Sequence, residues 1–323
     1  MSSPTDSIAG KRLVFLVGAP RSGTTWVQLM LASADEVATA NESHLFSECL
    51  ASLFDSWDAL RGNVREIGIH HLMTEDEYLS LVRDFASGVM ARILAKKPNA
   101  SIILEKTPQH VKVWRRILKT FPDACFLHLV RDPRSVVASL QAAQATWGRR
   151  WLSPRLIDYC SQWRYCVEQG REIGKHTKNY TEVRYEDFIN DGGQTLRSVF
   201  AWLGVERAPA ECEEIIARFS IDKLRSGAVT GTPWDLAAEP PDFYRRGTAE
   251  GWVGDLSPSQ ISLVEAMTKE VMPTFGYRPV SGAGRISRLA SLRLVFLRER
   301  IRAALYWRVG SLANRLSPRE RSL

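Results

Sequence analysis

The chain has 323 residues, of which 45% are hydrophobic and 24% charged, a composition typical of soluble globular proteins and sufficient for one large α/β domain or two smaller ones. Its five cysteines are scattered without a C-x-x-C pair and no His or Cys cluster has zinc spacing, so the sequence predicts neither a disulfide framework nor a metal site. The net charge is +7, but residues 281–323 hold ten Arg against two Glu, which leaves −1 for the rest of the chain; we therefore expect no nucleic-acid partner.

The N-terminal segment MSSPTDSIAG is short and polar. It lacks the apolar centre of a signal peptide, and no run of 18 apolar residues occurs in the sequence. Scattered, odd-numbered cysteines are also typical of a reducing compartment. These features predict a cytoplasmic protein without a membrane-spanning anchor.

Residues 12–26, RLVFLVGAPRSGTTW, form the most informative stretch of the chain. Residues 13–17 are an unbroken apolar run, which is typical of a buried parallel strand. A loop bounded by Gly18 and Gly23 follows, and the apolar residues after it recur with helical spacing. This order predicts an anion-binding loop, because glycines let backbone N–H groups approach an anion and a helix N-terminus adds partial positive charge.

The side chains of this loop suit an anion that needs no metal ion. Thr24 and Thr25 add hydroxyl donors, and Arg21 adds a planar, permanently charged guanidinium. Gly18 and Gly23 have the spacing of the ATPase pattern G-x-x-x-x-G-K-[ST], but Thr24 stands where that pattern has Lys. Because that Lys acts with Mg²⁺ on the phosphates of a nucleoside triphosphate, the loop argues against a metal-dependent ATPase or kinase.

Helical patterns separate this loop from the next strand. Residues 45–60 and 74–95 are expected to be helices, and Thr74 with Glu77 matches the capping box S/T-x-x-E. These helices interrupt the alternation of strands and helices. We therefore expect them to form a cap over the substrate side.

Three further segments predict strands, each followed by polar residues and a helix. The expected strands lie at 101–104, 124–130 and 180–184. The expected helices lie at 108–120, 133–145, 153–173, 191–220 (as two helices) and 258–270, with a loop-rich stretch at 221–256. This alternation predicts a three-layer α/β fold, similar to P-loop NTPases, with a mostly parallel sheet flanked by helices. Residues that follow the strands meet at one edge of such a sheet, where open α/β sheets bind ligands.

Three segments carry a resemblance to one enzyme family. GAPRSGTTW resembles the 5′-phosphosulfate loop of sulfotransferases that use 3′-phosphoadenosine 5′-phosphosulfate (PAPS) and release adenosine 3′,5′-bisphosphate (PAP). RDPRSVVAS, residues 131–139, resembles their 3′-phosphate motif, and FYRRGTAEGW, residues 243–252, resembles their late R-K/R-G loop. The chain is thus identified as a bacterial-type member, and we expect its sulfotransferase domain over residues 1–280.

The resemblance implies a set of residues that bind PAPS. Arg131 is expected to bind the 3′-phosphate through two guanidinium N–H groups. Ser139 lies about two turns into the following helix and is expected to face the same phosphate. Trp26 and Tyr185 are expected to contact the adenine. The implied cofactor-binding residues are Arg21, Ser22, Gly23, Thr24, Thr25, Trp26, Arg131, Ser139, Tyr185, Arg245, Arg246 and Gly247.

The resemblance also implies two cations that act on the transferring group. By analogy with phosphoryl transfer, sulfuryl transfer has a loose, in-line transition state with charge on the equatorial oxygens. Lys106 follows the second strand and matches the Lys of the family's K-T pattern, so it is assigned to the bridging oxygen and the leaving phosphate. Arg21 is assigned to the sulfonate region.

The catalytic base has three candidates. Cytosolic members of the family have His directly after K-T, where this chain has Pro108. Tyrosylprotein and several bacterial sulfotransferases instead use a Glu about twenty residues past the basic residue of the loop, and Glu42 matches that position. The resemblance therefore implies Glu42, which can act as a base if burial raises its pKa. His44 and His110 are the alternatives.

The sequence therefore predicts a sulfotransferase that moves a sulfuryl group from PAPS to a hydroxyl, or less readily an amine, of a small-molecule or lipid acceptor. Two other classes stay open: a P-loop kinase or NTPase, and a non-catalytic membrane-associated protein organised by the Arg-rich residues 281–323. This basic amphipathic extension is expected either to pack on the core or on a partner chain, as in a homo-oligomer, or to make peripheral contact with anionic lipid.

Overall fold

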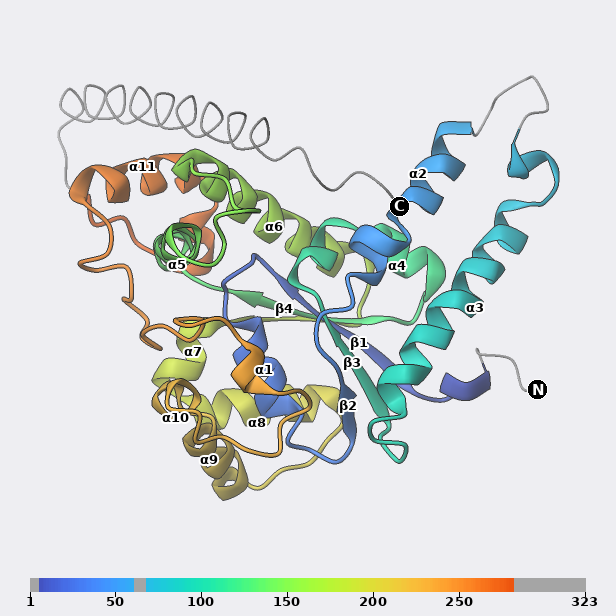
Figure 1. Cartoon of the computed structure of the whole chain (residues 1–323), viewed down its shortest axis with the longest axis horizontal. Helices are drawn as coiled ribbons and strands as arrows, with labels where there is room; N and C mark the ends of the chain where they lie inside the picture. The colour runs from blue at the N-terminus through green and yellow to red at the C-terminus, as the bar shows by residue number, and fades with distance from the viewer. Residues whose placement is uncertain (1–5, 61–67, 282–323) are drawn as a thin grey trace, which may run out of the picture. The chain divides into compact units, whose positions relative to one another are not determined.

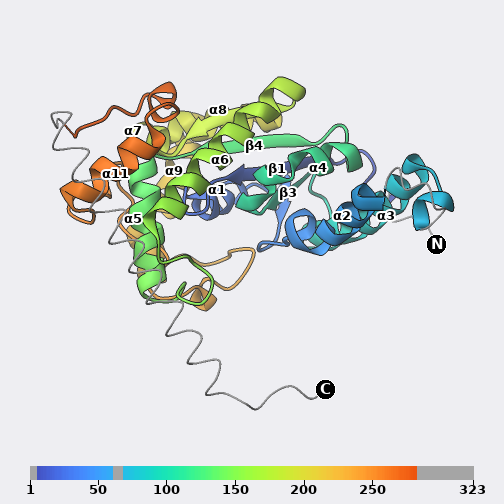
Figure 2. The same ribbon diagram turned by 90° about the horizontal axis from the view of Figure 1, so that it is seen from above.

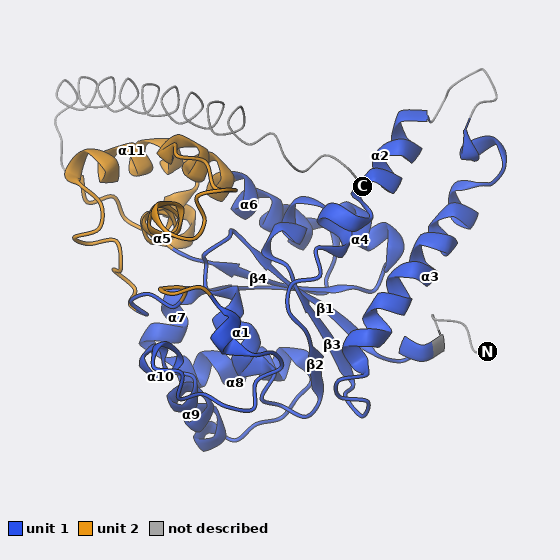
Figure 3. Cartoon of the chain, in the orientation of Figure 1, with its two compact units in different colours: residues 1–131, 165–239, 244–247 blue, residues 132–164, 240–243, 248–323 orange. Residues whose placement is uncertain are grey.

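The computed structural model describes residues 6–60 and 68–281, which belong to two compact units (Figure 3). The first unit comprises residues 1–131, 165–239 and 244–247, and the second comprises residues 132–164, 240–243 and 248–323. All five strands described below belong to the first unit. The expected C-terminal extension lies, apart from Ser281, outside the described residues, so its amphipathic helix and the boundary at 280 stay predictions.

Five parallel strands form the central sheet, in the order β2-β3-β1-β4-β5 (Figure 1). They are β1 (Arg12–Gly18), β2 (Val37–Thr39), β3 (Ile102–Lys106), β4 (Cys125–Val130) and β5 (Tyr180–Arg184). The order places β1, which carries the glycine loop at its carboxyl end, in the middle of the sheet. The predicted parallel sheet is confirmed. The sequence missed β2, because three residues are too few for a periodic pattern.

Successive residues of β1 face two different helical layers, as the alternation of a strand requires. Val14 and Leu16 belong to a hydrophobic core that includes Val27 and Leu29 of helix α1. Phe15 points to the opposite face and packs there against the rings of Phe46 and Phe126. Both faces of β1 are thus covered, which explains its unbroken apolar sequence.

Nine helices that lie wholly or partly in the first unit flank or extend from this sheet within the described residues. They are α1 (Thr24–Leu31), α2 (Ala51–Leu60), α3 (Glu75–Leu94), α4 (Trp114–Thr120), the C-terminal part of α6 (Leu156–His176), α7 (Tyr185–Asn190), α8 (Gly192–Leu203), α9 (Pro209–Arg218) and α10 (Ile221–Arg225). Helix α1 lies beside β1 and β3 (Figures 1 and 2), and its core continues into α7, α8 and α9. The opposite face carries α3, which contacts β2, β3 and α4. The three-layer arrangement is therefore as the sequence predicts.

The second unit is built on α5 (Pro133–Ala145), the N-terminal part of α6 and α11 (Pro258–Thr268). Its buried centre is Arg134, whose guanidinium lies 2.6 Å from an Asp132 oxygen and 2.9 Å from Glu265 on α11. The same guanidinium stacks 4.2 Å over the Trp252 ring. A buried charge is stable only when it is paired and hydrogen-bonded, and Arg134 satisfies that condition with two carboxylates.

Most predicted helices are confirmed, with three local corrections. The helix expected at 45–60 begins as a π-helical turn, Leu45–Cys49, before α2. The helix expected at 108–120 is divided into the 3₁₀ turn Pro108–Lys112 and α4. The short helix α10 lies in the stretch expected to be loop-rich.

Two other sequence expectations concern single features. Thr74 and Glu77 form the predicted capping box at the start of α3. None of the helices among the described residues combines the length and the apolar character needed to cross a membrane.

Candidate active site

The glycine loop joins β1 to α1 with two residues in the left-handed region of the backbone. Gly23 has φ 96° and caps α1, and Arg21 also has a positive φ of 70°. A Cβ atom on Gly23 would lie 2.6 Å from the Tyr185 ring, and one on Gly18 would lie 2.4 Å from the Leu129 carbonyl oxygen. The loop thus runs directly against its neighbours, which favours glycine at both ends.

The start of α1 has the properties of an anion site. The N-cap residue of this helix is Gly23, which has no side chain that could accept hydrogen bonds from the N–H groups of the first turn. The Ser22 hydroxyl is fully buried and has no hydrogen-bond partner among the described residues. A buried hydroxyl without a partner requires an explanation, and a bound anion at this helix terminus supplies one. The residues present therefore fit a phosphosulfate group.

Three arginines converge beside the loop. Burial and then the positive charges of Arg131 and Arg245 lower the pKa of Arg21 to about 10, and Glu239 only partly opposes them. Arg131 donates to the backbone oxygen of Arg21 at 3.3 Å, and its guanidinium lies 3.9 Å over the Tyr185 ring. Such a concentration of positive charge favours an anionic ligand. The structure thus brings Arg21, Arg131 and Arg245 together, as the motifs predict.

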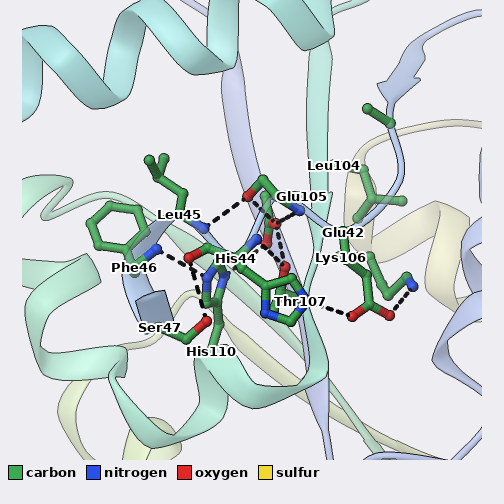
Figure 4. Close-up of polar contacts among 12 residues, drawn as sticks. Glu42, His44, Leu45, Phe46, Ser47, Leu104, Glu105, Lys106, Thr107 and His110 are labelled. Atoms are coloured by element: carbon green, nitrogen blue, oxygen red, sulfur yellow. Dashed lines mark hydrogen bonds and ion pairs between the residues drawn. The ribbon is translucent and has the colours of Figure 1, made fainter. Parts of the chain in front are cut away.

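Lys106 and Glu42 meet on the other side of the loop (Figure 4). The Lys106 ammonium group is buried, donates to Glu42 Oε1 at 2.6 Å and donates to Thr25 Oγ1 at 3.2 Å. An ammonium group has three donors, so one remains for a ligand. Glu42 and Thr25, which lie 64 and 81 positions before Lys106 in the chain, thus meet at its ammonium group. The contact brings together the two residues to which the resemblance assigns the roles of base and cation, and those roles stay predictions.

The two histidine candidates for the base have different surroundings. His44 Nε2 lies 3.3 Å from Glu42 Oε2, and about a third of the His44 side chain is exposed. His110 is fully buried, lies 2.8 Å from Glu105 through Nδ1 and accepts from the backbone N–H of Phe46 through Nε2. Both ring nitrogens of His110 are thus engaged, which leaves neither to accept a proton from a substrate.

The predicted adenine contacts lie deep in the protein. Trp26 is buried, donates through Nε1 to the Phe219 carbonyl at 2.7 Å and packs against Phe188. Tyr185 is also buried, and its ring centroid lies 5.5 Å from that of Trp26. Packing in the core explains the positions of both rings. Their contact with adenine stays a prediction, and their burial argues against it.

The remaining predicted residues occupy different places. Arg246 is exposed, whereas Gly247 has φ 65° and approaches Ile221 so closely that a Cβ atom would lie 2.4 Å from it. Thr24 and Thr25 are buried in the first turn of α1. Ser139 is buried on α5, which belongs to the second unit, so its role at the 3′-phosphate stays a prediction.

A second polar cluster lies at the end of β3 and was not predicted from the sequence. Glu105 is buried and lies within hydrogen-bond distance of Ser43, Thr107 and His110. Burial raises the pKa of Glu105, but the interactions with His110, Ser43 and Thr107 outweigh burial and lower it to about 2. The available signal was a carboxylate directly after the predicted strand at 101–104, where the observed β3 continues to Lys106. No group of three or more metal-ligating side chains occurs among the described residues.

Comparison with known proteins shows the family of this chain. A model of the sulfotransferase family matches residues 14–209. The protein-tyrosine sulfotransferase of Drosophila melanogaster is 29% identical over 203 residues, 60% of this chain but only 38% of that protein. The omega-hydroxy-beta-dihydromenaquinone-9 sulfotransferase Stf3 of Mycobacterium bovis is 26% identical over 249 residues, 59% of this chain and 62% of that protein. The chain belongs to the sulfotransferase family.

Solved structures show the same fold. The sulfotransferase domain of the Synechococcus PCC 7002 olefin synthase matches 84% of this chain and 97% of its own, with a TM-score of 0.56 and 20% identity. Mouse sulfotransferase SULT7A1, solved in complex with PAP, matches 84% of this chain and 90% of its own, with a TM-score of 0.51 and 16% identity. The fold class predicted from the alternation of strands and helices, and the family predicted from the three motifs, are therefore confirmed.

The lowered pKa of Glu105 predicts a specific loss of stability in acid. Because this pKa falls from 4.5 in the unfolded chain to about 2 in the folded one, its contribution is complete above pH 4.5 and disappears as the pH falls toward 2. We expect Glu105→Gln to remove about 3 kcal/mol of this pH dependence, measured by urea unfolding between pH 5.5 and 2.5. Glu214→Gln, which changes an exposed carboxylate on α9, is the control. Equal slopes for Glu105→Gln and the native chain would contradict the assignment.

Proposed function

We propose that this protein transfers a sulfuryl group from PAPS to a hydroxyl group of an acceptor. One observation carries the proposal: the loop with its orphaned Ser22 hydroxyl has the Lys106–Glu42 pair on one side and Arg131 on the other. All of these residues follow strands of one parallel sheet, at its carboxyl edge. The family to which the chain belongs supports the same conclusion.

The order of the strands supports a direction for the donor. Lys106 ends β3 on one side of β1, whereas Arg131 follows β4 and Tyr185 follows β5 on the other side. The 5′-phosphosulfate fits the central loop, where backbone N–H groups, Ser22 and Thr25 provide donors. The 3′-phosphate fits the side of Arg131 and Arg245. PAP in the mouse relative supports a donor of this class.

The chemistry assigned to the chain needs one base and two cations. PAPS, when bound, supplies the sulfuryl group and a bisphosphate leaving group. Glu42 takes the proton from the acceptor hydroxyl, and its partly exposed side chain can reach an acceptor that approaches from solvent. Lys106 places its third N–H on the bridging oxygen and Arg21 neutralises the sulfonate oxygens, where negative charge grows in the transition state.

The acceptor is proposed to be a small molecule or a lipid with a hydroxyl group. The names of the two relatives specify a protein tyrosine and an omega-hydroxy menaquinone, both of which present a hydroxyl. The exposed apolar residues Leu53 of α2 and Leu81 and Phe85 of α3 add weaker support for a hydrophobic acceptor. A cytoplasmic location, and membrane contact or oligomerisation through residues 282–323, stay predictions.

A direct assay separates this proposal from its rivals. We expect ³⁵S from labelled PAPS to appear on a hydroxylated isoprenoid quinone or on a tyrosine peptide, without any requirement for Mg²⁺. Incubation with γ-labelled ATP should transfer nothing. Phosphate transfer that EDTA abolishes would instead support a P-loop kinase, and binding to anionic vesicles without PAP affinity would support a non-catalytic membrane protein.

Replacement of Lys106 should affect the chemical step more than donor binding. Lys106→Met keeps the length of the buried side chain but removes its charge, so we expect kcat to fall by about 10²–10³, the usual effect of losing one donor to a transition-state oxygen. PAP affinity, measured by calorimetry, should change much less. Lys119→Met, at an exposed position on α4, should leave both quantities unchanged. Full turnover in Lys106→Met would exclude the assigned role.

Replacement of Arg131 should affect recognition of the 3′-phosphate. Arg131→Ala removes a charge-assisted contact worth about 2 kcal/mol, so we expect PAP to bind about thirtyfold more weakly. Adenosine 5′-phosphate, which lacks the 3′-phosphate, should bind equally well to both forms. Arg197→Ala, on the exposed side of α8, is the matched control. An equal loss for both nucleotides would place Arg131 elsewhere on the ligand.

A further inference from the structure

Four consecutive backbone N–H groups next to Glu42 are held by side chains. Ser43 N donates to Glu105 Oε1 at 3.4 Å, and His44 N donates to Thr107 Oγ1 at 3.2 Å. Leu45 N donates to Ser43 Oγ at 3.2 Å, and Phe46 N donates to His110 Nε2 at 3.2 Å. Hydrogen bonds therefore hold the backbone of residues 43–46 against the end of β3 and the turn that follows it (Figure 4).

All three of the side chains that accept from His44, Leu45 and Phe46 converge on Glu105. Ser43 Oγ donates to Glu105 Oε1 at 2.6 Å, and Thr107 Oγ1 donates to the same oxygen at 2.7 Å. His110 Nδ1 donates to Oε2 at 2.8 Å. The buried carboxylate thus orients each acceptor, because every hydroxyl or ring proton points at Glu105 and leaves its lone pair for a backbone N–H.

The contacts of His110 show which group each ring nitrogen faces. The Phe46 N–H donates to Nε2, and Nδ1 lies 2.8 Å from Glu105 Oε2. The ring therefore links the backbone of Phe46 to the buried carboxylate.

Neighbouring residues of β3 point to opposite faces of the sheet. Residues 42–46 pass across the end of β3 from one of these faces to the other. Glu42 contacts Lys106 on the face of α1, whereas Ser43, next in the chain, contacts Glu105 on the other face. His44 adopts φ 49°, a sparsely populated conformation for a non-glycine residue. Its fixed backbone N–H stabilises this crossing, and the crossing decides where the Glu42 carboxylate lies.

We propose that Glu105 is a positioning residue that, through Ser43, Thr107 and His110, orients Glu42 toward Lys106 and the acceptor. This inference rests on the proposed function, in which Glu42 is the base. Packing alone does not require a carboxylate here, since buried charges are often replaced by apolar residues without loss of stability. A carboxylate is required for orienting three donors at once.

Double-mutant analysis tests the inference. Turnover is followed as ³⁵S lost from PAPS, with water or the best acceptor of the assay above, for Glu42→Gln, Glu105→Gln and the double variant. We expect Glu105→Gln to lower kcat by about a hundredfold with unchanged PAP affinity, the effect of a misplaced catalytic group. In the Glu42→Gln background, Glu105→Gln should cost less than threefold, because the residue that it positions is already inactive.

The control is Glu182→Gln, which changes another partly buried carboxylate of the same sheet. Glu182 on β5 accepts from Tyr180 at 3.0 Å and lies 3.4 Å from the buried His128. It should lower stability without an effect on kcat. A similar loss of kcat in Glu182→Gln, or multiplicative effects of Glu42→Gln and Glu105→Gln, would overturn the positioning role.

A milder pair of variants covers the case in which Glu105→Gln does not fold. Thr107→Val removes the hydroxyl that links Glu105 to His44, and Thr107→Ser restores it. Amide hydrogen exchange of residues 43–46 should accelerate at least tenfold in Thr107→Val and return to the native rate in Thr107→Ser, with kcat following the same pattern. Native exchange or native kcat in Thr107→Val would refute the inference. Full activity of Glu42→Gln would instead refute the proposed base, which keeps the two failures distinct.

Discussion

The register of β3 beside β1 decides which charge faces the glycine loop. Leu16 of β1 pairs with Lys106 of β3, and Phe15 pairs with Glu105. Because side chains alternate along a strand, a slip of one residue would turn the carboxylate toward the loop and bury the ammonium group beside Phe15 and Phe126. After such a slip the carboxylate would repel an anion bound at the loop, and the ammonium group would be buried among aromatic rings. The apolar pattern that sets the register of the sheet therefore also determines which charge faces the loop.

Two opposite charges, each almost completely buried, therefore lie back to back at one strand end, and each is stabilised differently. Glu105 is surrounded by donors from Ser43, Thr107 and His110, which explains why its pKa lies near 2 although burial alone would raise it. Lys106 is paired with Glu42, whose side chain remains partly exposed. A charge pair that reaches solvent at one end can exchange partners with a ligand at modest cost, whereas the enclosed Glu105 cluster cannot. The Lys106–Glu42 pair therefore suits catalysis, and the Glu105 cluster suits a positioning role.

The sequence predicted four of the five strands and the loop because each has a local signal. Apolar runs revealed β1, β3 and β4, and the glycine spacing with Arg21 revealed the loop. Lys106 and Glu42 were predicted as separate functional residues from the resemblance alone, and their contact was not predicted. The Glu105 cluster joins Ser43 to residues more than sixty positions away, and no local pattern encodes such a contact. Likewise, no local pattern encodes the hydrogen bond from Trp26 to the Phe219 carbonyl, 193 residues further along.

Like charges lie close together at the arginine end of the loop. Burial and then the neighbouring cations Arg131 and Arg245 lower the pKa of Arg21, and Glu239 and Tyr244 only partly oppose them. At the other end Lys106 pairs with Glu42. An anion that binds across the loop therefore gains most where the arginines lie, and it stabilises the folded protein by relieving their repulsion. That asymmetry favours tight binding of the nucleotide phosphates and leaves the Lys106–Glu42 pair adjustable, as transfer to an acceptor requires.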